Sequence, residues 1–204
     1  MTNRREFLQI GIAATALPLA SRVALSATPA GTATATTTPV SLYKAIYDPR
    51  FPESVAYGHQ MEAQGIATQA IAKGDMTDFW YTELDPLWRK SPLAIAGLTA
   101  HGPLFCFEQL AWQHGMRVVF RGDHQVRRDA SIEHTLSGPD AMLRGATGLG
   151  ETRDWAVKMA KLAATCPTGR SALSTASFRG RADAPAAVDA DPLISWVIAP
   201  AVKA

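Results

Sequence analysis

Two histidines are the first candidates for chemistry, because the unperturbed pKa of histidine lies close to neutral pH. His101 and His124 each follow an apolar run that is typical of a β-strand. His101 also precedes Gly102-Pro103, a predicted helix start whose partial positive charge favours a neutral imidazole that can act as a base. We therefore take His101 and His124 as candidate catalytic residues. The alternative for His101 is a surface histidine in a loop.

Further charged and hydrogen-bonding side chains follow the apolar runs and are candidate ligand-binding residues. They are Asp48, Arg50, Asp75, Thr99, Arg121 and Asp123, together with Trp80 from an aromatic-rich connection. Groups of both signs that share one edge can bind a polar small molecule, a phosphate-bearing cofactor or a metal ion. The alternatives are that Asp48 and Asp75 cap helices or turns and that Trp80 lies in the core, in a lid or in an interface.

These residues share an edge only if the preceding runs are parallel strands. The pattern predicts strands at 42–47, 68–72, 93–99 and 116–120, with helices at 52–65 and 102–114. Alternating strands and helices are typical of βαβ units. In open parallel sheets, ligands bind beyond the carboxyl ends of the strands, where helix N-termini also lie.

The second half of the chain has fewer clear signals. Residues 152–166 have the spacing of an amphipathic helix that covers a sheet, and 193–199 predict a further strand bracketed by prolines. Glycine and serine spacing indicates loops at 137–150. The expected fold is α/β, with three layers, helices on both faces and a mostly parallel sheet of about four to six strands, similar to Rossmann and flavodoxin folds.

Recognised nucleophile and cofactor motifs are absent. The sequence contains no G-x-S-x-G elbow, no G-x-G-x-x-G loop after the first strand, no Walker A run and no H-E-x-x-H pair. We therefore assign no metal site, and the cofactor is unknown. Cys106 and Cys166 both fall on apolar helix faces, which favours two buried thiols over a disulfide.

Residues 1–26 resemble a twin-arginine (Tat) signal peptide. Residues 3–9 read Asn-Arg-Arg-Glu-Phe-Leu-Gln, with the arginine pair and Phe-Leu of the Tat pattern and departures from it at Asn3 and Gln9. The apolar run 10–19 that follows is shorter than the roughly 20 residues that span a membrane. Small residues before Ala27 predict cleavage after Ser26.

The resemblance implies export by the Tat translocase, through the pair Arg4 and Arg5, into the periplasm. Cleavage would remove three basic residues and one acidic residue, so that 20 basic and 18 acidic side chains become 17 and 17. A neutral chain without a basic face is not suited to nucleic acid. No second apolar run predicts a stable membrane anchor.

Residues 27–40, rich in Ala, Thr and Pro, predict a disordered leader before one α/β domain at 41–204.

The Tat route carries folded proteins, which include cofactor-loaded enzymes and the subunits exported with them. A chain without a cofactor motif fits the second role. The leading hypothesis is a periplasmic ligand-binding or accessory subunit that accompanies a larger periplasmic oxidoreductase subunit. The alternative is a stand-alone periplasmic enzyme that acts on a small anionic substrate with His101 as general base and Arg50 or Arg121 holding the anion.

Overall fold

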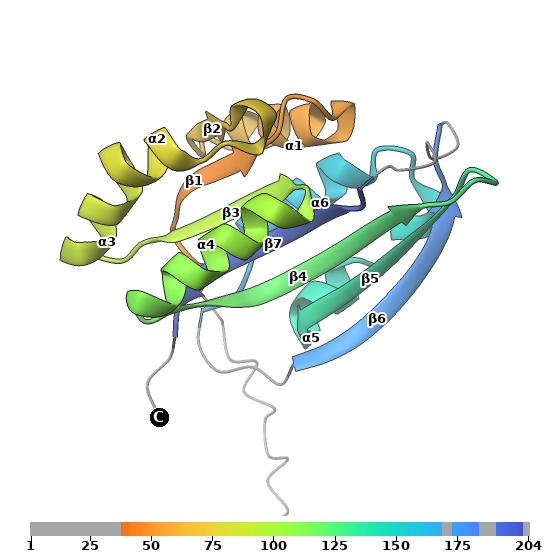
Figure 1. Ribbon diagram of the computed structural model, residues 1–204. Helices are drawn as coiled ribbons and strands as arrows, with labels where there is room; N and C mark the ends of the chain where they lie inside the picture. Colours follow the sequence, from red (N-terminus) through yellow and green to blue (C-terminus); the bar gives the residue numbers. More distant parts are fainter. Residues whose placement is uncertain (1–37, 169–172, 184–190, 202–204) are drawn as a thin grey trace, which may run out of the picture. The chain divides into compact units, whose positions relative to one another are not determined.

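A seven-stranded sheet organises residues 38–168, 173–183 and 191–201, which are the residues that the computed structural model describes (Figure 1). Its strands are β1 (Leu42–Tyr47), β2 (Thr68–Ala70), β3 (Ala94–Thr99), β4 (Met116–Val126), β5 (Ser131–Pro139), β6 (Leu173–Arg181) and β7 (Leu193–Pro200). They lie in the order β2-β1-β3-β7-β4-β5-β6. The predicted signal peptide falls outside the described residues.

Helices connect these strands. They are α1 (Pro52–Ala63), α2 (Thr77–Phe79), α3 (Asp85–Lys90), α4 (His101–Gln113), α5 (Asp140–Gly145) and α6 (Trp155–Ala164). The short 3₁₀ segments η1 (Ala72–Gly74) and η3 (Leu149–Glu151) and the π-helical turn η2 (Trp80–Leu84) complete the set. The last residues of the predicted leader have defined partners, because Pro39 bridges Pro167 and the Val40 N–H donates to the Cys166 carbonyl at 2.7 Å.

The sheet is largely antiparallel, so the prediction of a mostly parallel sheet was wrong. Only β1 runs parallel to its neighbours β2 and β3, whereas β7, β4, β5 and β6 each pair antiparallel with their neighbours. The cause is a return of the chain after β4: the Arg127 N–H donates to the Ser131 carbonyl at 2.8 Å and closes a hairpin into β5. The α/β class is confirmed, and the Rossmann-like or flavodoxin-like detail is not.

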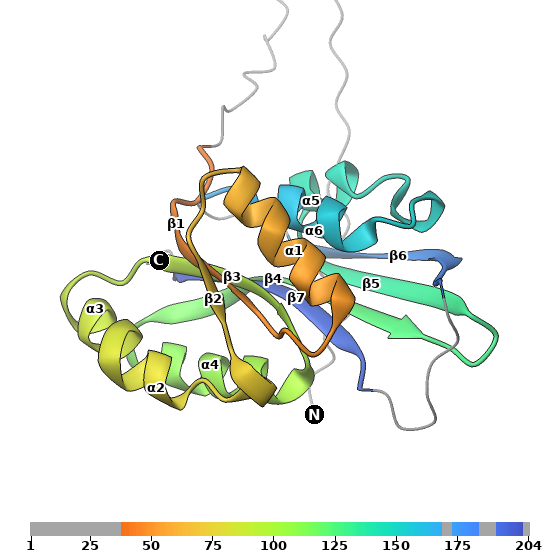
Figure 2. The ribbon, with the colours of Figure 1, turned by 90° about the horizontal axis from the view of Figure 1, so that it is seen from above.

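Helices cover both faces of the sheet, as predicted. Figure 2 shows α1, α5 and α6 on one face and α2, α3 and α4 on the other. We call these the α6 face and the α4 face. Each has its own apolar core: Tyr57, Met61 and Met159 lie in the first, and Phe107 and Trp196 in the second. Buried apolar area on both faces supplies the main driving force for this layered arrangement.

The region from 121 to 181 differs most from expectation. β4 runs to Val126 instead of ending at Phe120, because its polar second half pairs with β5 on one side and β7 on the other. The predicted loops at 137–150 are the end of β5, then α5 and η3. The predicted helix at 152–166 is confirmed as α6, and its apolar residues are buried against the sheet.

Candidate functional site

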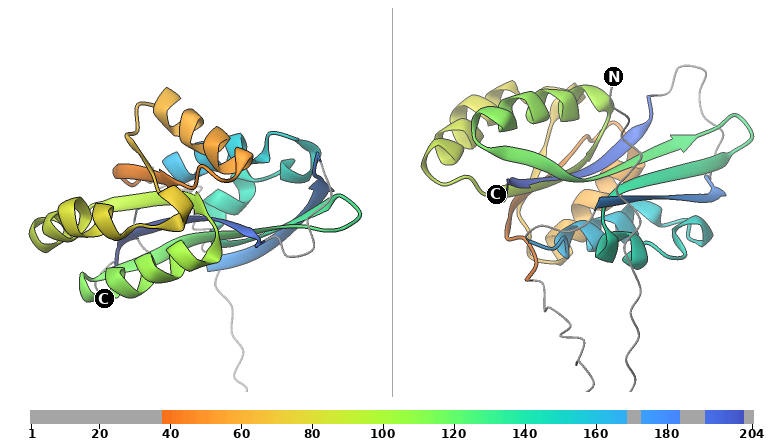
Figure 3. Two further views of the ribbon diagram at one scale, coloured as in Figure 1. Left: turned by 45° about the horizontal axis from the view of Figure 1, so that its top comes forward. Right: turned by 90° about the horizontal axis from the view of Figure 1, so that it is seen from below.

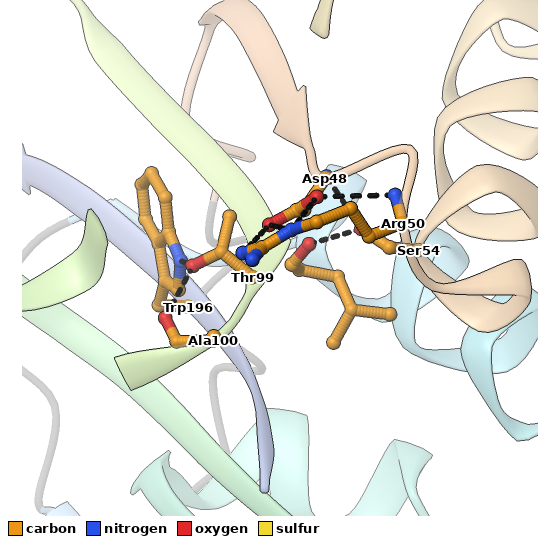
Figure 4. Close-up of polar contacts among 7 residues, drawn as sticks. Asp48, Arg50, Ser54, Thr99, Ala100 and Trp196 are labelled. Carbon is orange, nitrogen blue, oxygen red and sulfur yellow. Dashed lines mark hydrogen bonds and ion pairs between the residues drawn. The ribbon is translucent and has the colours of Figure 1, made fainter. Parts of the chain in front are cut away.

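Asp48 follows β1 directly and is fully buried. Its carboxylate accepts hydrogen bonds from the Arg50 side chain, at 3.0 Å from Nε to Oδ1 and 2.6 Å from Nη2 to Oδ2, and from the Arg50 backbone N–H at 3.1 Å (Figure 4). A buried carboxylate needs such pairing to offset the loss of water. The hydrogen bond to Asp48 raises the pKa of Arg50, so the guanidinium stays charged. The Arg50 side chain is 47% exposed and can reach a ligand.

Ser54 anchors this pair to the sheet. It lies in the first turn of α1 and is buried. Its hydroxyl accepts a hydrogen bond from the Asp48 N–H at 2.8 Å and donates one to the Leu98 carbonyl of β3. One side chain therefore joins the end of β1, the start of α1 and the end of β3 (Figure 4). Ser54 was not predicted from the sequence, because a single serine in a helix carries no recognisable motif.

The turn from β3 into α4 forms the second part of the edge. Thr99 is buried, accepts a hydrogen bond from Trp196 Nε1 at 3.1 Å and donates one to the Ala100 carbonyl at 3.0 Å. The N-cap residue of α4 is Ala100, so no side chain caps the helix. The first N–H groups of a helix carry partial positive charge and are free to bind an acceptor when no side chain caps them. The Thr99 hydroxyl is used in its two hydrogen bonds, to Trp196 and to the Ala100 carbonyl, so Thr99 positions the turn into α4.

His101 is the first residue of α4, as predicted, and it is exposed. Its ring stacks on Phe105, with centroids 6.2 Å apart and an interplanar angle of 21°. No hydrogen bond or ion pair to His101 is found among the described residues. The imidazole is therefore accessible at the helix N-terminus but lacks the oriented partner that a general base normally has.

Gly74 shows that the two parts of the edge meet. A Cβ atom at this position would lie 3.2 Å from Arg50 Nη2 and 3.3 Å from Pro103 Cγ in the first turn of α4. The Gly74 backbone has a φ of 76°, which favours glycine. The Arg50 guanidinium and the start of α4 therefore line the same point. We call the group Asp48, Arg50, Ser54, Gly74 and His101 the β1–β3 edge.

Asp75 has the turn role that was one of its alternatives, and the N-cap residue of α2 is Met76. Its side chain is exposed, and Oδ1 accepts a hydrogen bond from the Thr77 N–H at 2.9 Å. That hydrogen bond lowers the pKa of Asp75. The carboxylate thus stabilises the turn into α2, and no hydrogen bond or ion pair joins it to Asp48 or Arg50 in the described part of the chain.

Arg121 and Asp123 lie inside β4, not after it as predicted. They form an ion pair at 2.8 Å on the α4 face. Asp123 and Thr99 pair with Ile194 from opposite sides, so the two residues are level along the sheet. Because β7 lies between Asp123 and Thr99, and neighbouring strands lie about 4.8 Å apart, these two residues are about 10 Å apart. The structure therefore places Arg121 and Asp123 near the β1–β3 edge but does not join them to it.

His124 is on the opposite face, so its predicted place at the edge is wrong. It is buried, with Nδ1 at 2.7 Å from His134 Nδ1 and Nε2 at 2.8 Å from Ser195 Oγ. Burial first, and then the proximity of His134, lower the pKa of His124 well below 6.5. Asp123 precedes His124 directly in β4 and therefore points to the other side of the sheet.

Three further residues named in the sequence analysis, Trp80 and the two cysteines, lie outside the β1–β3 edge. Trp80 is buried in the α4-face core, with its ring centroid 5.8 Å from that of Trp88, so it is not a stacking platform for a ligand. Cys106 is exposed, which contradicts its predicted burial, because it lies on the solvent side of α4. Cys166 is buried, as expected, and both thiols are free.

Neither a protein-family model nor a curated protein nor a solved structure matches this chain. In the described ranges, no group of three or more His, Cys, Asp or Glu side chains has an arrangement that could hold a metal ion. Within the same ranges, every helix is too short or too polar to cross a membrane.

Proposed function

We propose that this chain is a periplasmic ligand-binding or accessory protein, exported folded, that holds a small anion at the β1–β3 edge. The observation that carries the proposal is the half-exposed Arg50 guanidinium, which is fixed by the buried Asp48 carboxylate beside the uncapped N-terminus of α4. The guanidinium and the helix N-terminus each attract negative charge, and both lie next to Gly74.

The pairing with Asp48 orients Arg50 without using all its donors. Its hydrogen bonds to the carboxylate involve Nε and Nη2, and Nη1 makes none among the described residues. A guanidinium with an unused edge can bind a carboxylate or phosphate oxygen. Because Asp48 and Ser54 hold the arginine before the ligand arrives, little side-chain entropy is lost on binding.

The role of His101 as a general base has less support than a binding role. The imidazole is exposed and stacked on Phe105, and no described carboxylate orients it. A catalytic base is normally held by a hydrogen-bond partner, although such contacts can tighten when substrate binds. His101 is better suited to contribute an N–H donor at the rim of the anion site.

An accessory role has separate support on the surface of the molecule. Phe105 and Trp112 on α4 are 52% and 49% exposed, and Tyr81 on η2 is 70% exposed. Aromatic side chains are enriched in protein interfaces, where they anchor a partner. The Tat-like segment fits the same role, since that route exports subunits together with folded redox enzymes. The proposed partner is a larger periplasmic oxidoreductase subunit.

Calorimetric titration of the purified chain with inorganic phosphate and with succinate tests the anion site. We expect saturable binding of at least one of them, and an affinity lower by about ten- to a hundredfold in Arg50→Ala, because a charge-assisted hydrogen bond is lost. Arg50→Lys keeps a positive charge beside Asp48, so this variant should fold even if Arg50→Ala does not. Its affinity for the anion should also fall, because lysine lacks the planar guanidinium with its paired N–H donors.

Arg89→Ala is the matched control. Arg89 is also paired with a carboxylate, that of Asp85 at 2.9 Å, but on α3 and remote in sequence from the edge. This variant should bind like the wild type. The anion site would be disproved if neither anion bound, or if all three variants bound with wild-type affinity while circular dichroism showed them to be folded.

A further inference from the structure

β6 is a long, regular edge strand. All nine of its residues pair with β5, from Leu173 opposite Pro139 to Arg181 opposite Ser131, without a bulge. No other described strand pairs with its outer side, and Figure 3 shows it at the margin of the sheet. The opposite edge is different, because β2 has only three residues and ends at η1.

Edge strands normally carry features that prevent pairing with another chain. Charged side chains, proline, a bulge or a very short length are the usual ones. β6 has no proline and no bulge, and its two charged residues, Arg179 and Arg181, both lie at its C-terminal end. The six residues before them have no such protection and expose backbone N–H and C=O groups that a second strand can satisfy.

The side chains of β6 alternate between two kinds of surface. Phe178 is partly buried and packs against the α6-face core, and Ala176 is on the same side of the strand. Ser177 and Thr175 are on the other side and are exposed. A strand added beside β6 would therefore need apolar residues toward the α6 face and polar residues toward the α4 face.

We infer that β6 pairs with the same strand of a second copy of this chain. The two strands run antiparallel about a two-fold axis at Ser177, and the two sheets become continuous. A two-fold axis perpendicular to the sheet requires antiparallel pairing and brings the same surface from both copies together. The inference goes beyond the proposed function and does not depend on it.

The sequence of β6 matches this self-pairing in charge and in polarity. With Ser177 opposite its own copy, Arg179 is opposite Thr175 and Arg181 is opposite Leu173, so no two like charges face each other. Leu173, which is 71% exposed, gains cover from the aliphatic stem of Arg181. On the α6 face, Phe178 is opposite Ala176. The pattern is thus complementary to itself in this register.

Light scattering coupled to size-exclusion chromatography tests the inference on the purified chain. We expect a dimer for the wild type and a monomer for Ser177→Lys and for Ser177→Glu, because each puts two like charges directly opposite one another. An equimolar mixture of the two variants should form dimers again, since the opposed charges are then of opposite sign. Circular dichroism of each variant should match the wild type, because Ser177 is exposed.

Gln125→Lys is the control. Gln125 is exposed on β4, faces the same side of the sheet as Ser177 and lies two strands from the edge. This variant should remain a dimer. A monomeric wild type at micromolar concentration, a dimer that persists in Ser177→Lys, or a mixture of the two variants that stays monomeric would each overturn the inference.

Discussion

Asp48 and His124 are both buried and polar, and they are stabilised in opposite ways. The Asp48 carboxylate is paired with the Arg50 guanidinium, which hydrogen-bonds to both of its oxygens. His124 is buried without a carboxylate partner and contacts His134 and Ser195 instead. A neutral imidazole is stable there, whereas a charged one would lie beside a second imidazole in an apolar surrounding closed by Trp155.

The hydrogen-bond pattern also indicates which ring carries which proton. If His134 donates from Nδ1 to His124 Nδ1, then His124 can donate from Nε2 to Ser195 Oγ, and Ser195 can donate to the Gly122 carbonyl. This arrangement leaves His134 Nε2 as an acceptor without a partner in the described residues. The opposite arrangement would leave a buried N–H without an acceptor, which is the less favourable state.

The histidine pair predicts a loss of stability in mild acid. Burial lowers the pKa of His134 from 6.5 to about 4, and that of His124 is lowered as well. Below pH 6.5 the unfolded chain binds protons that the folded chain does not, so the free energy of unfolding falls between pH 6.5 and about 4. The stabilisation is complete above this range. The loss is at most about 1.4 kcal/mol per pH unit for each histidine.

Urea unfolding at a series of pH values across this range measures the effect. In His134→Gln one of the two groups no longer titrates, so stability should depend less steeply on pH, whatever the variant does to stability at neutral pH. His59→Gln, which replaces an exposed histidine of α1, should keep the wild-type slope. Equal slopes in His134→Gln and the wild type would contradict the prediction.

At the scale of elements, the contact between β3 and β7 determines how the β1–β3 edge is held. Gly97 of β3 pairs with Trp196 of β7, and a Cβ atom on Gly97 would lie only 2.4 Å from the Trp196 ring. The ring lies against Gly97 and donates its N–H to the Thr99 hydroxyl at 3.1 Å. This close approach fixes the end of β3 relative to α4.

Gly97→Ala should therefore destabilise the protein, by about 1–3 kcal/mol, because the indole must move and its hydrogen bond to Thr99 is strained. Chemical denaturation measures the change. Gly102→Ala is the control, since a Cβ atom there meets no other atom within 4 Å in the first turn of α4. Its stability should be unchanged or slightly raised, because alanine is the better helix former. Similar losses in both variants would argue against the Trp196 contact as the cause.

At the scale of the whole molecule, the Tat-like segment predicts how the protein is delivered. Replacing both Arg4 and Arg5 by lysine should keep the chain in the cytoplasm at its full length, because the paired arginines are the feature by which the segment resembles a Tat signal. Cell fractionation followed by mass spectrometry measures both location and cleavage. Arg22→Lys, behind the apolar run, is the control and should be exported and cleaved.

The wild-type chain recovered from the periplasm also tests the accessory role. It should co-purify with a larger protein that contains flavin, molybdenum or haem, identified by its absorption spectrum and metal content. Export of the double lysine variant at the wild-type level would contradict the Tat prediction. A wild-type chain that purifies without any such protein would contradict the accessory role.

The sequence by itself predicted those elements and site residues that depend on neighbours along the chain. The run before Asp48 is a strand, the glycine and proline after His101 begin a helix, and the apolar spacing of α6 buries the predicted face. Asp48 and Arg50 lie near the start of α4, which begins at His101, because β1 and β3 are adjacent and parallel, as the βαβ pattern indicated. Local propensity and periodicity are sufficient for such features.

Only the tertiary structure decided the partners of the later strands. The hairpin after β4 has no glycine or Asn-Gly signal, and its turn depends on Ala130, a non-glycine residue with a φ of 59°. β7 inserts between β3 and β4, although it lies near the end of the chain. His124 and Ser195 are 71 residues apart in sequence. Strand order and direction follow from the burial of both sheet faces, a property of distant residues acting together that no local pattern records.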